Sequence, residues 1–244
     1  MIFFDIDGTL IDHLSASADA SLVLYDHFPG EIPFARDTFA ETWETIMTKH
    51  FNRFCRGEIS IWDQRRARMR EVFGRPDFSD ADADRRYRVF IEAYESQTRA
   101  FDDAAPCLEQ LKDEPLGIIS NGAREQQVGK LERAGLLKYF SVLVFSEDAG
   151  LGKPAEAIFR EACRRANAQP PQCMHVGDDL VADVAASHAL GMTTVWIDRL
   201  GIEGCPLPVR RISTLQDLSG AGIEAQNPAP PNPKYFAGVR DLRG

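Results

Sequence analysis

Two aspartates stand two residues apart where the first apolar run of the chain ends. Residues 2–4 are Ile-Phe-Phe, and they are followed by Asp5-Ile6-Asp7. Two carboxylates in this arrangement repel each other unless a cation or a proton relieves the repulsion. Residues two apart in an extended chain also point to the same side. The pair therefore indicates either a solvated loop or a site that uses both carboxylates for chemistry.

Other polar groups follow three later apolar runs. They are Ser120-Asn121-Gly122, Gly152-Lys153-Pro154, and Gly177-Asp178-Asp179 with Asp183 shortly after. In an open parallel sheet, ligands bind at the carboxyl ends of the strands, so we expect these groups to meet at one edge. Carboxylates together with a lysine and a hydroxyl–amide pair indicate a divalent metal held by oxygen ligands beside a phosphate.

The elements that must position these groups are indicated by continuous apolar runs, which are typical of strands buried on both faces of a parallel sheet. The runs lie at residues 2–4, 116–120, 142–145, 173–177 and 193–197. Segments with helical spacing separate the later runs, at residues 124–134, 155–166 and 180–190. The alternation predicts an α/β fold, a doubly wound parallel sheet with a Rossmann-like core.

The stretch after the first strand differs in kind, because it has long charged amphipathic segments and no run typical of a strand. Helical spacing is evident at residues 34–54 and 60–72, and Ser60-Ile-Trp-Asp63 has the form of a capping box. A further helix is expected to begin at Ser79. The predicted division is a catalytic core at 1–14 and 100–222, an all-helical insertion at 15–99, and a Pro-rich tail at 223–244.

Composition limits the class of partner. The chain of 244 residues has 37 acidic and 28 basic side chains and a net charge of -9, which argues against nucleic acid and against an anionic membrane surface. Its five cysteines are widely spaced without a CxxC pair, which is typical of reduced thiols. No basic leader precedes the early aspartates, so we expect a cytoplasmic protein. Whether it is a monomer or a homodimer is left open.

Four motifs of the chain resemble those of the haloacid dehalogenase superfamily. They are DIDGTL (residues 5–10), ISNG (119–122), GKPAEAIF (152–159) and VGDDLVAD (176–183). Within that superfamily the chain is similar to the phosphatase branch with a helical cap inserted after the first motif, which includes nucleotidase-like and phosphoglycolate-phosphatase-like proteins. The resemblance extends from residue 1 to about residue 218.

The chemistry that suits these residues is transfer of a phosphoryl group to a carboxylate. Asp5 is the expected nucleophile, because a carboxylate can form an aspartyl phosphate that water then hydrolyses. Asp7 would protonate the leaving alkoxide and later deprotonate the attacking water. Ser120 would hold phosphate oxygens, and Lys153 would offset the charge of the nucleophile and the phosphate.

The resemblance also implies the metal and its ligands. Mg²⁺ would contact the carboxylate of Asp5, the backbone carbonyl of Asp7 and the side chain of Asp178. Asp183 would orient metal-bound waters. Whether Asp183 or Asp179 touches the metal directly is left open.

The resemblance further implies which residues bind the substrate. Thr9, Asn121 and Gly122 belong to the matching motifs, and glycine at 122 would let the backbone approach the phosphate closely. Arg68 of the insertion is similar to a cap arginine that faces the active site in nucleotidase-like relatives. The alternative for Arg68 is a solvated arginine on a helical face. His175 lies inside a predicted strand and is expected to be structural.

We therefore expect a Mg²⁺-dependent phosphatase that acts on a small phosphorylated metabolite. A nucleoside monophosphate, flavin mononucleotide and a sugar phosphate are the candidate substrates. Asp7 argues against dehalogenation, because dehalogenases of the superfamily lack the second aspartate, and displacement of halide needs neither proton donor nor metal. The alternatives are a phosphomutase on the same scaffold and a non-catalytic regulator that binds a phosphorylated ligand.

Overall fold

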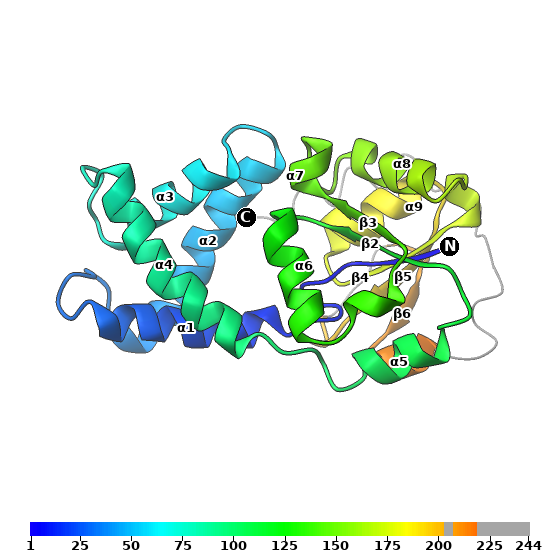
Figure 1. The fold of residues 1–244 in the computed structure, drawn as a ribbon, viewed down its shortest axis with the longest axis horizontal. Coiled ribbons are helices and arrows are strands. Elements are labelled where there is room, and N and C mark those ends of the chain that lie inside the picture. Colours follow the sequence, from blue (N-terminus) through cyan, green and yellow to red (C-terminus); the bar gives the residue numbers. More distant parts are fainter. Residues whose placement is uncertain (203–206, 219–244) are drawn as a thin grey trace. The chain divides into compact units, whose positions relative to one another are not determined.

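The computed structural model of the protein describes residues 1–202 and 207–218. The chain divides into two compact units: Met1–Ile11 with the chain from Ala100 onward, and Asp12–Arg99 (Figure 1). The Pro-rich tail predicted at residues 223–244 lies outside the described residues, as does Cys205. The other four cysteines are buried free thiols.

The first unit contains one sheet of six strands. They are β1 Ile2–Phe4, β2 Leu116–Ser120, β3 Val142–Phe145, β4 Met174–Gly177, β5 Thr193–Ile197 and β6 Arg210–Ile212. The strand order is β3-β2-β1-β4-β5-β6, and every neighbouring pair is parallel. From β1 the chain adds β2 and β3 on one side of the sheet and then β4, β5 and β6 on the other. This change of direction confirms the predicted doubly wound α/β fold. β6 was not predicted, because its three residues include two arginines and form no apolar run.

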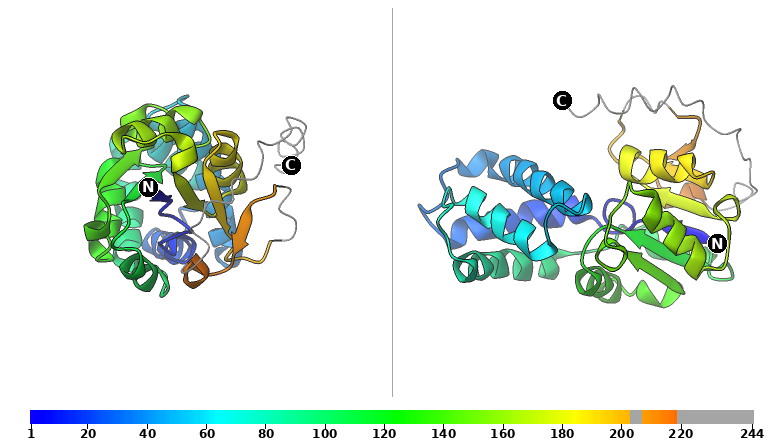
Figure 2. Two further views of the ribbon diagram at one scale, coloured as in Figure 1. Left: turned by 90° about the vertical axis from the view of Figure 1, so that its right-hand side faces the viewer. Right: turned by 90° about the horizontal axis from the view of Figure 1, so that it is seen from above.

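Helices cover both faces of this sheet (Figures 1 and 2). They are α5 Ala104–Gln110, α6 Arg124–Arg133, α7 Ser146–Ala149, α8 Glu156–Arg165 and α9 Ala186–Ala189. Successive strand residues point to opposite faces, so Phe4 packs in one apolar cluster with Leu131 of α6. Phe3 packs in another with Phe159 of α8. Burial on both faces explains why each strand is a continuous apolar run.

One helix departs from the prediction. Residues 180–190 were expected to form a single α-helix, but Leu180–Ala185 form a π-helix and only Ala186–Ala189 continue as α9. The carboxylate of Asp179 accepts hydrogen bonds from the backbone N–H groups of Val181 and Ala182, both at 2.7 Å. Asp183 lies within this wide turn and directs its carboxylate to Lys153. Wide turns of this kind occur frequently at functional sites.

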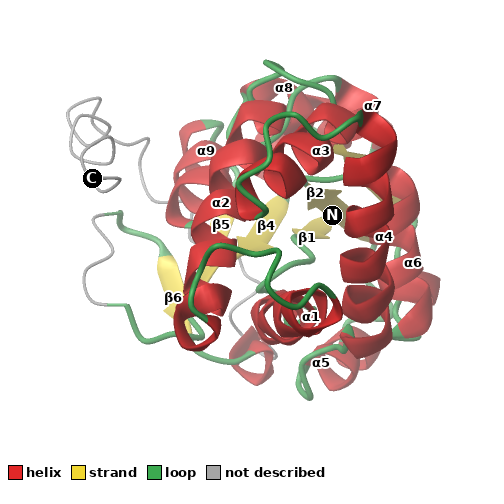
Figure 3. Ribbon diagram, turned by 90° about the vertical axis from the view of Figure 1, so that its left-hand side faces the viewer, coloured by secondary structure: helices red, strands yellow, loops and turns green. Residues whose placement is uncertain are grey.

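The second unit is all-helical, as predicted (Figure 3). Its helices are α1 His13–His27, α2 Phe39–Cys55, α3 Ile61–Val72 and α4 Asp80–Gln97. The hydroxyls of Ser60 and Ser79 accept hydrogen bonds from the backbone N–H groups three residues later, each at 3.1 Å, and so cap α3 and α4. The core is aromatic, with the rings of Trp43 and Phe90 4.1 Å apart. None of the described helices combines the length and the apolarity needed to cross a lipid bilayer.

Candidate active site

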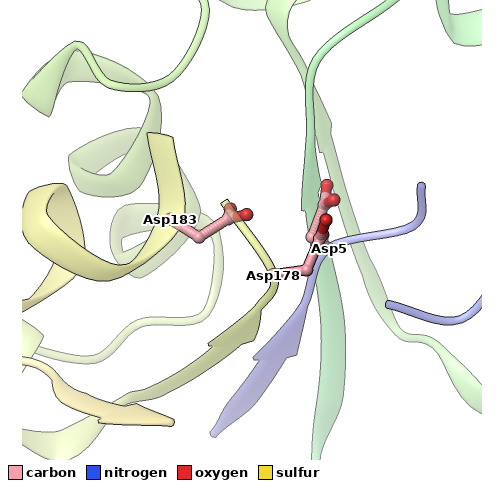
Figure 4. Close-up of side chains that lie close together, drawn as sticks. All are labelled: Asp5, Asp178 and Asp183. Carbon is pink, nitrogen blue, oxygen red and sulfur yellow. The ribbon is translucent and has the colours of Figure 1, made fainter. Parts of the chain in front are cut away.

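The carboxyl ends of three neighbouring strands bring the predicted side chains together. Phe4 of β1 lies opposite Ile118 of β2 and Val176 of β4. Asp5 therefore follows β1 at the level where β2 ends in Ser120, and Asp178 lies just beyond β4. Figure 4 shows Asp5 and Asp178 side by side at these strand ends, with Asp183 directed toward them from the next segment. Ligand oxygens of Asp5, Asp178 and Asp183 lie within 4.8 Å of one another.

Lys153 lies between two of these carboxylates. Its Nζ atom is 2.6 Å from Oδ1 of Asp5 and 2.5 Å from Oδ1 of Asp183, and its side chain is only 3% exposed. The side chain of Asn121 fixes the Lys153 backbone at two points, because Nδ2 donates to the carbonyl at 2.9 Å and Oδ1 accepts from the N–H at 2.7 Å. Asn121 thus joins the loop after β2 to the lysine loop, and its predicted contact with the substrate stays a prediction.

Asp183 is held by three donors. Besides Lys153, the Nε2 atom of His175 is 2.9 Å from Oδ1, and the Asp179 N–H donates to Oδ2 at 3.1 Å. Burial would raise the pKa of Asp183, but Lys153 and His175 outweigh it and hold the pKa at about 2. Asp183 is therefore a fixed anion. His175 was expected to be structural, and no feature of its strand indicated this contact.

The pKa values of Asp5 and Asp178 are raised, because burial and neighbouring carboxylates outweigh the effect of Lys153. Burial raises the pKa of Asp5 to about 7, with Lys153 opposing the shift and Asp183 and Asp7 adding to it. Burial, Asp5 and Asp183 together raise the pKa of Asp178 well above its usual range. Buried carboxylates in this condition bind either protons or a cation. Hard oxygen donors gathered in this way fit a divalent metal such as Mg²⁺.

The residues after Asp7 support Asp178. Gly8 has a φ of +83°, and a Cβ atom at this position would lie 2.2 Å from Oδ2 of Asp178, so only glycine fits. The hydroxyl of Thr9 donates to Oδ1 of Asp178 at 3.1 Å, and Thr9 is fully buried. The side chain of Thr9 thus orients Asp178, and its predicted contact with the substrate stays a prediction.

Asp7 is held by two side chains of α6, a contact that was not predicted. Nζ of Lys130 lies 2.6 Å and 2.7 Å from the two carboxylate oxygens of Asp7, and Nε2 of Gln127 lies 3.0 Å from Oδ2. The Gln127 amide also donates to the Ser120 hydroxyl at 3.2 Å. The Gly122 N–H donates to the Ser146 hydroxyl at 2.8 Å, and the predicted close approach of Gly122 to the phosphate stays a prediction.

Arg68 belongs to the second unit and is buried there, with 5% of the residue exposed. Its guanidinium donates to Oε1 of Gln64 at 3.0 Å and lies over the rings of Trp43, Tyr87 and Phe90, 5.2–5.8 Å from their centres. Within residues 1–202 and 207–218, no carboxylate forms an ion pair with it. The alternative of a solvated arginine is therefore wrong.

Comparisons with known proteins agree with this geometry. A sequence model of the haloacid dehalogenase-like hydrolase family matches residues 1–191. N-acylneuraminate-9-phosphatase of Mus musculus is 26% identical over 229 residues, which cover 89% of this chain and 91% of that protein. Ribulose-1,5-bisphosphate 5-phosphatase of Halopiger xanaduensis is 35% identical over 112 residues, which cover 45% of this chain and 47% of that protein. The chain thus matches about half the length of the second relative.

Solved structures show the same fold. HAD-hydrolase YfnB from Bacillus subtilis, solved with magnesium, is 24% identical with a TM-score of 0.76 and covers 89% of this chain and 95% of its own. A 2-haloacid dehalogenase from Pseudomonas syringae is 27% identical with a TM-score of 0.66 and covers 98% of both chains. A HAD-hydrolase and a 2-haloacid dehalogenase therefore share this architecture.

The chain belongs to the haloacid dehalogenase-like hydrolases. Its similarity to phosphatases, in one case over nearly the full length, makes it an enzyme of the phosphoric monoester hydrolase class. The family and the enzyme class predicted from the motifs are confirmed.

Proposed function

We propose that this enzyme is a Mg²⁺-dependent phosphatase of small phosphorylated metabolites that forms an aspartyl phosphate on Asp5. The observation that carries the proposal is the cluster of Asp5, Asp178 and Asp183 around Lys153. The names of the two relatives above favour a sugar phosphate among the three candidate substrates. A cytoplasmic location stays a prediction.

The charges at the strand ends fit a divalent metal. Four carboxylates, those of Asp5, Asp7, Asp178 and Asp183, share two buried lysines, Lys153 and Lys130. With all four carboxylates ionised, two negative charges are left, which one divalent cation would balance. The Asp5 carboxylate, the Asp178 carboxylate and the Asp7 backbone carbonyl would hold the ion. Mg²⁺ bound there would neutralise charge on the phosphate and on the nucleophile together.

The protein's own groups then divide the reaction between them. Lys153 binds Oδ1 of Asp5 and so fixes the carboxylate that attacks phosphorus. Asp7 in its protonated form gives its proton to the leaving oxygen in the first step, and the carboxylate that remains takes a proton from water in the second. The Ser120 hydroxyl and the Lys153 ammonium group would bind the phosphate oxygens, where negative charge increases in the transition state.

Arg68 would recognise a polar or anionic group of the substrate. Burying a guanidinium without a carboxylate partner costs stability, and burial lowers its pKa. A substrate group could supply the missing partner. This part of the proposal rests on the surroundings of Arg68 within the helical unit.

Dehalogenation is the second reaction that the fold can carry. Displacement of halide needs no proton donor, so it gives no task to Asp7, whose two oxygens are held by a buried lysine. We therefore favour phosphate transfer, and the dehalogenase reaction becomes an outcome of the test.

The test is release of inorganic phosphate by the purified protein with MgCl₂, from a panel of sugar phosphates, nucleoside monophosphates and flavin mononucleotide. We expect turnover that falls about 10³-fold or more in Asp5→Asn, while Asp113→Asn, at an exposed position, keeps full activity. Isomerised sugar without free phosphate would indicate a phosphomutase, and binding without turnover would indicate a regulator. Halide release from a 2-chloro acid without phosphatase activity would indicate a dehalogenase.

A further inference from the structure

We propose that Lys130 and Gln127 of α6 are positioning residues that hold the Asp7 carboxylate where it can exchange a proton with the leaving group. The inference rests on the proposed function, in which Asp7 is the acid and base. It adds two residues that lie outside the four motifs at 5–10, 119–122, 152–159 and 176–183.

Lys130 contacts both oxygens of Asp7. The Nζ distances of 2.6 Å and 2.7 Å leave the carboxylate one favoured orientation. The residue is only 3% exposed, although Asp7 itself is half-buried. Burial of the Lys130 ammonium group costs desolvation free energy, and a well-placed carboxylate partner is needed to offset that cost.

Gln127 joins Asp7 to the loop that carries Ser120. Its Nε2 atom lies 3.0 Å from Oδ2 of Asp7, 3.2 Å from the Ser120 hydroxyl and 2.7 Å from the Asn121 carbonyl. The loop fits closely around this amide, because a Cβ atom at Gly122 would lie 3.0 Å from Nε2. The Gln127 side chain thus holds both Asp7, the proposed acid, and the Ser120 hydroxyl, which is expected to bind phosphate.

α6 has an apolar anchor in addition to these contacts. Leu131 already anchors α6 in the core beside the sheet, with no exposed surface. Residues three apart on a helix share a face, so Gln127 and Lys130 reach the same carboxylate. Asp7 is thus the common partner of both side chains. A shift of about 1 Å in the position of a catalytic group costs about 10²-fold in rate.

Leaving-group dependence separates positioning of an acid from general damage. An alkoxide leaves only with a proton, whereas p-nitrophenolate leaves without one. The quantity to measure is kcat/KM, because it reports the steps up to formation of the phosphoenzyme. In Lys130→Met we expect kcat/KM for a primary alkyl phosphate to fall about 10²-fold and that for p-nitrophenyl phosphate to change less than about 5-fold.

The series contains its own controls. Asp7→Asn sets the full effect of losing the acid, Lys130→Arg should restore part of the alkyl activity, and Lys138→Met, which removes an exposed lysine, should match wild type. If Lys130→Met does not fold, Gln127→Leu keeps the ion pair and should show a smaller loss in the same direction.

Two results would overturn the inference. One is an equal loss on both substrates in folded Lys130→Met, with Asp7→Asn selective for the alkyl ester. The other is no loss in either α6 variant. If wild type hydrolyses neither substrate, the proposed function fails instead, so the two failures are distinguishable.

Discussion

Nζ of Lys153 lies 2.6 Å from Oδ1 of Asp5, and the two side chains are 3% and 9% exposed. The same ammonium group binds Asp183 at 2.5 Å. Burial alone would lower the pKa of Lys153, but Asp183 and Asp5 hold it above its usual value. Lys153 is therefore a permanent cation shared by two buried carboxylates, and the charge balance of the site depends on it.

Replacing this cation tests that dependence. In Lys153→Met we expect kcat/KM for phosphate release to fall about 10³-fold, because a donor to the transition state is lost. The free energy of unfolding should fall by about 3 kcal/mol, since two buried carboxylates lose their partner. Urea denaturation at pH 7 measures the second effect. Lys112→Met removes an exposed lysine and should stay within about 0.5 kcal/mol of wild type. Activity retained within a few-fold would contradict the role of Lys153.

The Asp178 carboxylate should not stabilise the folded protein without metal, but it should stabilise it when Mg²⁺ is bound. In metal-free protein at pH 7.5, Asp178→Asn should leave the melting temperature Tm unchanged or raise it, because it relieves repulsion from Asp5 and Asp183. A Mg²⁺ concentration of 100 Kd stabilises the wild type by about 2.7 kcal/mol, and the variant should lose most of that gain.

Thermal unfolding with EDTA and with MgCl₂ measures both parts of this prediction. Asp113→Asn, at an exposed position, should gain as much from Mg²⁺ as wild type does. An Asp178→Asn variant that is stabilised by Mg²⁺ as strongly as wild type would show that the ion binds elsewhere.

The fold and the motif residues could be predicted because each depends on local pattern. Strands buried on both faces must be continuous apolar runs, and the residues that follow them must meet at one edge of a parallel sheet. That reasoning placed Asp5, Ser120 and Asp178 correctly. It failed for β6, which is short and charged, and for the π-helix at Leu180–Ala185, because a wide turn has no signature in apolar spacing.

The supporting residues could not be predicted, since their partners are distant in sequence. Lys130 meets Asp7 across 123 positions, and α6 is so polar that its inner face resembles a solvated one. Arg68 presented the same difficulty, because Arg65, Arg66 and Arg70 share its helix and the pattern does not indicate which arginine is buried. Tertiary packing decides which lysine meets Asp7 and which arginine of α3 is buried.

Asp103 gives a prediction for the dependence of stability on pH. Its carboxylate accepts from Arg199 at 2.9 Å and 3.0 Å, from the Thr214 hydroxyl at 2.7 Å and from the Leu215 N–H at 2.9 Å. Burial would raise the pKa of Asp103, but these donors outweigh it and lower the pKa. A carboxyl with a lowered pKa stabilises the folded state fully above its unfolded pKa of about 3.9 and loses that effect as pH falls through the folded value.

Asp103→Asn should therefore lower the free energy of unfolding by about 3 kcal/mol at pH 7. The difference from wild type should shrink below about pH 4, where Asp103 of the unfolded chain takes up a proton that the folded carboxyl, with its lowered pKa, does not yet bind. Urea denaturation at pH 7, 5 and 3.5 measures the trend. Asp113→Asn makes the same chemical change at an exposed position and should show almost no difference at any pH. A gap that stays constant down to pH 3.5 would contradict the ion-pair explanation.

Arg68 can be tested by asking whether it serves stability or substrate. Its guanidinium is buried among aromatic rings with Gln64 as its hydrogen-bond partner, so methionine of similar length should fill the space. We expect Arg68→Met to unfold within about 1 kcal/mol of wild type, since replacing a buried charge by an apolar side chain is often neutral. The KM for the best phosphorylated substrate should rise about 10-fold, the cost of one charged hydrogen bond. Arg88→Met, at an exposed position of α4, should change neither quantity. A loss of several kcal/mol with an unchanged KM would make Arg68 a structural residue of the helical unit.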